Sequence, residues 1–312
     1  MRNLMTVLGC FLLLSGISNK VSAQYYFYDN KYYDNPVTFE LGGSVSAMNC
    51  LTDLGGRKGI GKKFIKDVNF GKFQPAGSVY VSANYKYMIS LRAEATFGKV
   101  TADDAILKSV KASTYGRYER NLSFRSNISE FMIAAEIHPL YIFAKYDDDW
   151  EPPMISPYLL AGVGFFHFNP QAKYDGKWID LQPLSTEGQG FKEYPGRTPY
   201  KLSQMNIPIG IGGLYELTNT LNVRAEIVYR LLSTDYLDDV STTYIDPTLY
   251  PTYFTGNKLT NALLLNDRQW ELDPSHITSE GDQRGNPKHN DAYFTFSIKI
   301  GYVFGRESIR RK

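Results

Sequence analysis

The sequence contains almost no cysteine, because Cys10 and Cys50 are the only two among 312 residues. Cys10 lies in an N-terminal run that we predict to be removed, so the mature chain keeps one thiol and forms no intramolecular disulfide. The sequence also has no marked excess of positive or negative charge. Lys and Arg number 34 and Asp and Glu 32, a net charge of +2 that falls to 0 once Arg2 and Lys20 are removed. This balance does not indicate a nucleic-acid partner.

Long apolar runs are missing after residue 23, and the mean hydropathy is −0.31. These absences exclude a helical membrane protein. At the N-terminus, Arg2 precedes the apolar run 4–17, and the small residues 21–23 form a cleavage site before Gln24. The run is shorter than the roughly 20 residues of a spanning helix, and it continues past Cys10, which disfavours a lipoprotein. We therefore predict a signal peptide over 1–23, followed by an N-terminal periplasmic segment over 24–35.

Catalytic and metal-binding constellations are missing as well. Cys50 has no evident histidine partner, and no Gly-x-Ser-x-Gly motif occurs. The stretch GRKGIGKK (56–63) nearly matches a phosphate-binding loop, but Lys63 stands where a hydroxyl is needed and no amphipathic helix follows. We interpret it as a solvated basic loop and predict no enzymatic activity, no cofactor and no metal. Ligand spacing is absent among the four histidines, which are His138, His167, His276 and His289.

Strict alternation of apolar and polar residues is what the sequence does contain, most clearly over 291–304. Successive side chains of a strand point to opposite faces, so one face of this segment is apolar. Large rings lie at both ends of that face with aliphatic side chains between them, as on a lipid-facing strand. The aromatic content of 14%, with 24 tyrosines, suits two interfacial belts. The apolar positions are Phe294, Phe296, Ile298, Ile300, Tyr302 and Phe304.

Eight segments alternate in this way: 37–49, 78–87, 89–97, 122–137, 155–168, 205–217, 221–232 and 291–304. The lipid-facing register of 155–168 stays open, because both of its faces carry large apolar residues. Long connections (50–77, 98–121, 169–204 and 233–290) alternate with short ones (86–88, 138–154 and 218–220). The pattern predicts an all-β fold, an eight-stranded antiparallel transmembrane outer-membrane β-barrel over 36–304. Long loops would be extracellular, short turns periplasmic, and both termini periplasmic, with a basic C-terminal tail over 305–312.

Charged residues recur on the polar faces of these segments. An eight-stranded barrel is only just wide enough to be filled by its own side chains. Opposite charges that face one another inside it are expected to pair, because buried charges need partners. We predict a charge network that fills the lumen, and a proton pathway, substrate pathway or paired-carboxylate active site is the alternative. The predicted members are Glu40, Arg92, Glu94, Glu130, Glu136, Arg224, Glu226, Arg230 and Lys299.

Four stretches, taken together and in this order, carry a family resemblance: RNLSFRSNISEF (120–131), SPYLLAGVGFFHFNP (156–170), KWIDLQPLSTEGQG (177–190) and TDYLDDVSTTYID (234–246). They resemble the PorG-like outer-membrane β-barrel component of the type IX secretion system of Bacteroidota. The resemblance implies a Gram-negative outer-membrane protein that associates with a periplasmic ring of the lipoprotein PorK and of PorN. It further implies a role in anchoring that ring while cargo with a C-terminal sorting domain is exported. The segment 247–290 matches the family pattern poorly.

Two other functions are considered beside this one. A surface adhesin or ligand-binding barrel would use the long outer loops, and an outer-membrane hydrolase would need catalytic groups on the rim. If the secretion hypothesis holds, the ring is contacted by periplasmic parts. Three consecutive aspartates in the 138–154 connection are candidates; their spacing is not that of an EF-hand calcium loop, so a solvated acidic turn is the simpler interpretation. The candidate contacts are Asp147, Asp148, Asp149, Arg306, Arg310, Arg311 and Lys312.

Overall fold

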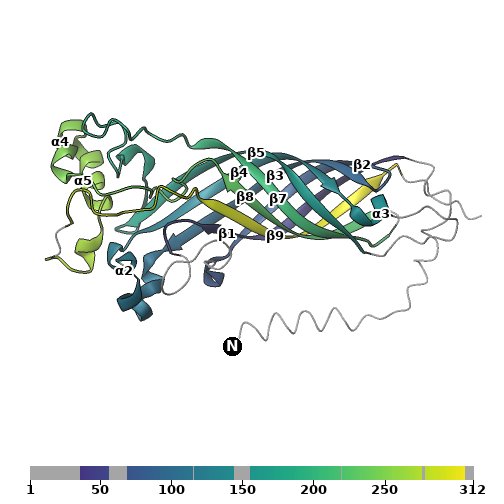
Figure 1. The fold of residues 1–312 in the computed structure, drawn as a ribbon, viewed down its shortest axis with the longest axis horizontal. Helices are drawn as coiled ribbons and strands as arrows, with labels where there is room; N and C mark the ends of the chain where they lie inside the picture. The colour runs from purple at the N-terminus through teal and green to yellow at the C-terminus, as the bar shows by residue number, and fades with distance from the viewer. Residues whose placement is uncertain are drawn as a thin grey trace, which may run out of the picture.

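The computed structural model describes residues 36–55, 69–114, 116–143, 155–218, 220–275 and 278–305. Over these residues the chain forms one antiparallel sheet in the order β4-β3-β2-β1-β9-β8-β7-β5-β6, and an additional β4–β5 pairing closes it. Eight strands make the closed ring, and β6 (Lys177–Asp180) lies outside it beside the end of β5. The predicted eight-stranded antiparallel barrel is therefore confirmed (Figure 1). The ring strands are β1 (Val37–Leu51), β2 (Gln74–Tyr85), β3 (Ile89–Asp103), β4 (Ser123–Ile137), β5 (Ile155–Tyr174), β7 (Ser203–Glu216), β8 (Leu221–Leu232) and β9 (Ala292–Phe304).

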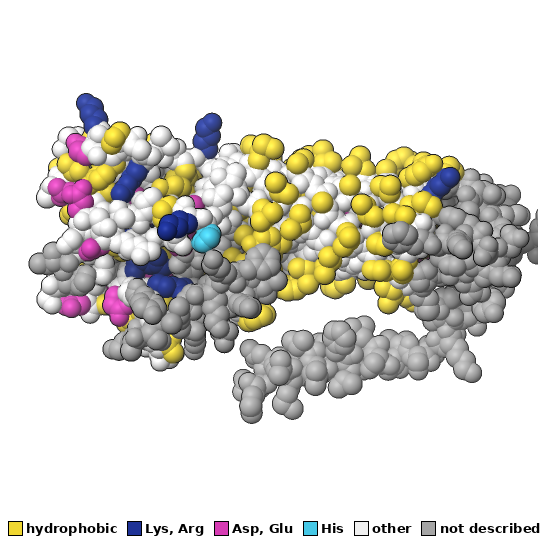
Figure 2. Space-filling model, viewed as in Figure 1, with side chains coloured by type: hydrophobic (Ala, Val, Ile, Leu, Met, Phe, Trp, Pro, Cys, Tyr) yellow, Lys and Arg dark blue, Asp and Glu magenta, His cyan; other side chains and the backbone are white. Residues whose placement is uncertain are grey.

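A broad apolar belt surrounds the barrel, and it is exposed. Figure 2 shows it as the hydrophobic zone along the barrel, distinct from the mixed charges at the loop end. Val163, for example, is 56% exposed, although a large exposed apolar area is uncommon on proteins surrounded by water. Aromatic rings mark both edges of the belt, as expected where a barrel meets the two membrane interfaces. These exposed rings are Phe97, Phe131 and Phe165 on the loop side, and Phe39, Tyr85, Tyr302 and Phe304 on the turn side.

The structure resolves the register of β5. Odd-numbered residues from Ile155 to Phe165 point outward, while Tyr158, Phe166 and Phe168 point inward and are buried. Pro208, which lacks an N–H, interrupts the pairing of β5 with β7 opposite Gly162 and Val163. Pairing resumes at Gly164↔Asn206 in the same register, so the barrel tolerates this proline.

Several strands are longer than the alternation predicted. We expected loops at 98–121 and 169–204, but β3 continues to Asp103 and β5 to Tyr174. β2 likewise begins at Gln74, inside the expected 50–77 loop. Beyond the belt the outer face meets water instead of lipid, so its residues become polar while backbone pairing continues. The apolar pattern therefore marked the edge of the belt and not the end of the strand.

One end of the barrel carries the short connections. Lys86 and Tyr87 join β2 to β3 with φ of 48° and 59°, and the Met88 N–H donates to the Tyr85 carbonyl at 3.0 Å, which makes a tight hairpin turn. The expected 138–154 turn contains the short helix α3 (Pro139–Phe143). The start of β1 and the end of β9 lie at this same end (Figure 1).

The long connections fold together at the opposite end, which we call the cap (residues 104–122, 175–202 and 233–291). An apolar cluster that includes Leu184, Phe191, Tyr250 and Leu265 holds the later two connections together. In the described residues, no helix is long and apolar enough to cross a membrane. The helical elements here are η5 (Asp104–Ser113), α2 (Arg117–Arg120), η6 (Gln182–Leu184), η7 (Pro247–Leu249), α4 (Tyr250–Tyr253), α5 (Gly256–Leu265) and η8 (Gln269–Glu271), and η4 (Phe70–Lys72) lies in the β1–β2 connection.

Candidate functional site

The lumen holds all nine of the charged residues selected from the sequence. Each is at most 5% exposed, and each takes part in at least one ion pair. They reach this position because they occupy the inward phase of their strands, which is the opposite phase to the exposed belt. The network divides into three groups along the barrel.

The group nearest the short turns is centred on Arg224 of β8. Its guanidinium lies 2.8 Å from the Glu40 carboxylate and 2.7 Å from that of Glu136. Glu40 also accepts hydrogen bonds from Tyr80 (2.5 Å) and Asn222 (2.8 Å). Glu40 is therefore fully satisfied, as an ionised carboxylate in a dry interior needs to be.

The middle group connects three strands. Arg92 lies 2.9 Å from Glu226 and 3.1 Å from Glu136, which links this group to the previous one. Lys299 lies 3.0 Å from Glu226 and also pairs with Glu94. Glu94, Glu136 and Glu226 each contact two cations, so removing one cation weakens the compensation of several buried carboxylates at once.

The third group and an apolar stopper fill the loop end of the lumen. Arg230 pairs with Glu130 at 3.1 Å, and Asn206 donates to the same carboxylate at 2.7 Å. Beyond them, the rings of Tyr293 and Phe166 lie 5.8 Å apart, and neither side chain is exposed to solvent. Stacked rings continue from here into the cap, through Phe166, Phe168, Tyr200 and Tyr236.

The charges in the lumen do not balance. Five glutamates face three arginines and one lysine, which leaves one negative charge. His138 lies beside this excess, with Nε2 3.6 Å from Glu136 and Nδ1 3.0 Å from the Ser156 hydroxyl.

Sequence reasoning missed the neutral members of the network. Tyr80 and Tyr158 donate to Glu40 and Glu226 at 2.5 and 2.6 Å, so buried hydroxyls complete the carboxylate shells. Both tyrosines lie on inward positions of their strands, so the alternation of the sequence could have identified them as residues of the lumen. The role of Gly301 was not visible: a Cβ there would lie 2.2 Å from Glu40 Oε1, so glycine makes room for the carboxylate.

The cap contains ionic contacts of its own. Arg120 holds Asp104 through Nε at 2.9 Å, and Arg284 lies 3.0 Å from Glu187. Glu187 also accepts from the backbone N–H groups of residues 241 and 242, so it ties two long connections together. Burial raises the pKa of Asp239 to about 6, although Arg284 nearby lowers it. These ion pairs could not be predicted from the sequence, because the loops that carry them show no periodic pattern.

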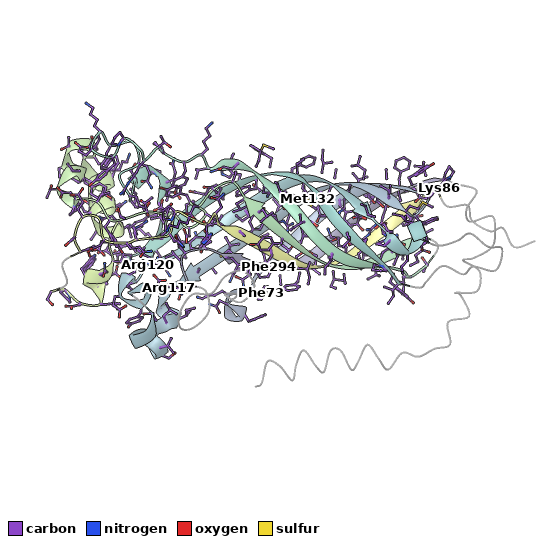
Figure 3. All side chains as sticks on the ribbon, viewed as in Figure 1. Phe73, Lys86, Arg117, Arg120, Met132 and Phe294 are labelled. Carbon is purple, nitrogen blue, oxygen red and sulfur yellow. The ribbon has the colours of Figure 1, made fainter. Side chains whose placement is uncertain are left out.

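The β1–β2 connection also contacts the outer wall. Phe73 packs its ring 5.8 Å from that of Phe294 and 5.7 Å from that of Phe296 (Figure 3). Phe294, expected on the lipid face, is therefore only 6% exposed. Phe70, whose ring lies 6.2 Å from that of Phe73, is 76% exposed.

Several predicted features lie outside the described residues. They are the signal peptide, the segment 24–35, the basic stretch 56–63, His276, and the candidate contacts Asp147, Asp148, Asp149, Arg306, Arg310, Arg311 and Lys312. Of the other histidines, His167 points outward and contacts the Ser203 hydroxyl at 2.9 Å, and His289 is exposed. Over the part of the chain that the structure describes, no His, Cys, Asp and Glu side chains are grouped to hold a metal ion.

Comparison with known proteins finds distant structural likeness only. No family model matches the chain, and no curated protein matches it either. Among solved structures, Neisserial surface protein A has 10% identity and a TM-score of 0.38, covering 85% of this chain and 97% of that one. Outer membrane protein OprG of Pseudomonas aeruginosa has 10% identity and a TM-score of 0.38, with 88% and 99% covered. The attachment invasion locus protein Ail of Yersinia pestis, solved with a heparin analogue, has 8% identity and a TM-score of 0.34, with 86% and 97% covered.

Proposed function

We propose that this chain is a structural, non-enzymatic protein of the outer membrane that acts through its two ends and not through its lumen. The filled lumen is the observation that carries this proposal. Arg92, Arg224 and Arg230 occupy it together with their carboxylate partners, and the Tyr293–Phe166 stopper covers them. A solute would have to displace paired buried charges, which is strongly unfavourable. The exposed apolar belt supports the membrane position.

Within that role, we propose a component of the type IX secretion system that ties a periplasmic PorK/PorN ring to the outer membrane. The sequence resemblance supports this assignment. Its four stretches also form one continuous unit: 120–131 and 156–170 pair within β4 and β5, and 177–190 meets 234–246 where the Ser241 N–H donates to Glu187 at 2.9 Å. Residues that resemble one family thus contact one another.

The ring would be contacted at the end that carries the short turns. There α3 exposes two apolar side chains, Leu140 at 42% and Ile142 at 40%. Two neighbouring apolar side chains at the rim suit either a protein partner or the membrane interface, and a pull-down distinguishes the two.

A second candidate function is binding of an extracellular ligand by the cap. It is favoured by apolar side chains that the cap exposes although it has its own core: Leu263 at 40%, Trp270 at 38% and Leu272 at 45%. A folded cap presents such residues in fixed positions, which lowers the entropic cost of binding.

Affinity purification in mild detergent tests both functions with two matched double variants. Leu140→Ser with Ile142→Ser changes the turn end, and Leu263→Ser with Leu272→Ser changes the cap. We expect the wild type and the cap variant to co-purify the ring, and the turn-end variant to lose it. The second function is favoured by the opposite result. In that case both variants co-purify the same secretion-system partners as the wild type, and the cap variant no longer binds an extracellular ligand.

A further inference from the structure

Four aspartates lie together where the cap meets the barrel. Asp53 follows the end of β1, Asp235 and Asp238 follow β8, and Asp291 precedes β9. Hydrogen bonds link these connections: the Leu54 N–H donates to Asp238 Oδ2 at 3.0 Å, and the Leu237 N–H donates to Asp291 Oδ2 at 2.9 Å. The carboxylates therefore join the β1–β2 connection to both ends of the β8–β9 connection.

Three of these four aspartates are buried, Asp53 is half-buried, and no cation pairs with any of them among the residues described. Asp238 is 0%, Asp291 3% and Asp235 8% exposed, and none of the four aspartates forms an ion pair with a residue that the structure describes. Of the nearby guanidinium groups, Arg120 is held by Asp104 and Arg284 by Glu187.

Asp235 is the least satisfied member. Neither oxygen of its carboxyl group forms a hydrogen bond of normal geometry, although Asp235 is only 8% exposed; the one polar side chain that acts on it favourably is the nearby Ser241 hydroxyl. A buried ionised carboxylate without partners is strongly unfavourable, and such a group takes up a proton instead. A bound metal ion is the other way to neutralise it, but the described residues contain no group arranged to hold one.

We propose that the cluster of Asp53, Asp235, Asp238 and Asp291 is a proton-binding latch: Asp235 is protonated at neutral pH, and loss of its proton loosens the cap. Burial, and then the charges of Asp53 and Glu187, raise the pKa of Asp235 to about 8, although the Ser241 hydroxyl lowers it. Burial and the other carboxylates of the cluster also raise the pKa values of Asp238 and Asp291 well above the usual range.

The groups that face the latch do not reverse this direction. The Asp238 carboxyl faces Arg120, which lowers its pKa, but Asp53 and Asp235 act against that cation. The Cys50 thiol lies within reach of the charges of Asp238 and Asp291 and carries no positive charge. Arg120 and Arg117 lie at the loop end of the molecule (Figure 3), and Arg117 donates to the Gly55 carbonyl.

The sign of the pH effect follows from these shifts. A carboxyl group whose pKa is raised by folding favours the folded cap fully below its unfolded pKa, and that contribution is lost as the pH rises through the folded pKa. The cap is therefore expected to be tight in mild acid and to loosen toward pH 8. Each pH unit in that range increases the open fraction by up to about tenfold per carboxyl group.

Two measurements on the purified full-length protein test the latch. Infrared spectroscopy detects the carbonyl stretch of protonated carboxyl groups between pH 5 and pH 9, and limited proteolysis of residues 233–291 reports cap opening over the same range. The matched variants are Asp235→Asn, which mimics the protonated form, and Asp175→Asn on the exposed β5–β6 turn. Asp175 has φ of 45°, which asparagine tolerates.

In the wild type and in Asp175→Asn, we expect a protonated-carboxyl band at pH 7 that disappears near pH 8 together with faster cleavage. In Asp235→Asn, that band weakens and the cap stays resistant at pH 9. Absence of the band from the wild type at pH 7 would overturn the proposal without any variant. The proposal also fails if calcium chloride alone removes the band at pH 7 and protects the cap, because the cluster would then be a cation site.

Discussion

The guanidinium of Arg224 on β8 lies 2.8 Å from the carboxylate of Glu40 on β1, although β9 runs between these two strands. The contact is possible because β9 presents Gly301 to the lumen at this level, where a Cβ would lie 2.2 Å from Glu40 Oε1. A residue without a side chain thus allows one ion pair to span three strands of the barrel wall.

Replacing Arg224 tests how strongly the lumen depends on its charges. Arg224→Met leaves Glu40 without a cation and Glu136 with Arg92 alone, and we expect the free energy of unfolding to fall by about 3–5 kcal/mol. Urea titration of the protein in lipid vesicles measures the loss. Lys72→Met is the control, because the side chains of its pair with Asp103 are 28% and 21% exposed and such a partly solvated pair is worth only about 1 kcal/mol or less. Equal losses in the two variants would contradict a cooperative network.

Gly301→Val tests the space that β9 leaves for the Arg224–Glu40 pair. The added side chain would meet Glu40 Oε1 and the Tyr80 hydroxyl, so we expect a destabilisation of about 1–3 kcal/mol or more from overpacking. The control is Gly196→Ala in the cap, where a Cβ meets no atom within 4 Å. Heat-dependent mobility on gels gives the relative stability of both variants. A fully stable Gly301→Val protein would show that the lumen can repack.

A lysine introduced into the belt tests the lipid contact. Val163 is 56% exposed within the belt, and Val163→Lys should cost about 2–4 kcal/mol if hydrocarbon covers this position. Asn127→Lys makes the same kind of change on the outward face of β4 beyond the belt and should be nearly neutral. Folding equilibria in lipid vesicles against urea give both values. If the two lysines cost the same, the belt does not contact lipid.

Because the lumen is filled, we predict that the protein does not conduct ions. Purified wild-type protein in a planar bilayer should carry no steady ion current at neutral pH, because the paired charges and the Tyr293–Phe166 stopper leave no continuous water path. Single-channel recording is the measurement. Steady openings from correctly folded protein would refute the structural role proposed above and return a transport role to consideration.

The sequence predicted the orientation of a strand correctly where its outer face contacts lipid and its inner face contacts charged residues. Within the belt, lipid outside and charges inside produce alternation, so Phe296, Ile298 and Ile300 were placed correctly on the outer face. In β5 the rule was ambiguous, because the stopper is apolar too and Phe166 faces inward beside the outward-facing Phe165. Burial of Phe294 could not be predicted, since it depends on Phe73 in a distant loop.

The cap was the least predictable part. Its contacts, such as Arg284 with Glu187, join residues 97 positions apart in segments that lack any period. Asp235 and Asp291 likewise carried no sequence signal, because only the folded connections bring them together and bury them.

The extension of β3, β4 and β5 past the belt has a consequence for access. Arg125 lies six residues beyond Phe131 on the outward face of β4, which places it roughly 15 Å farther along the barrel at a rise of about 3.3 Å per residue and the usual tilt. The barrel thus acts as a stalk that holds its far end clear of the lipid headgroups. A large soluble molecule can approach that end from the side as well as from above.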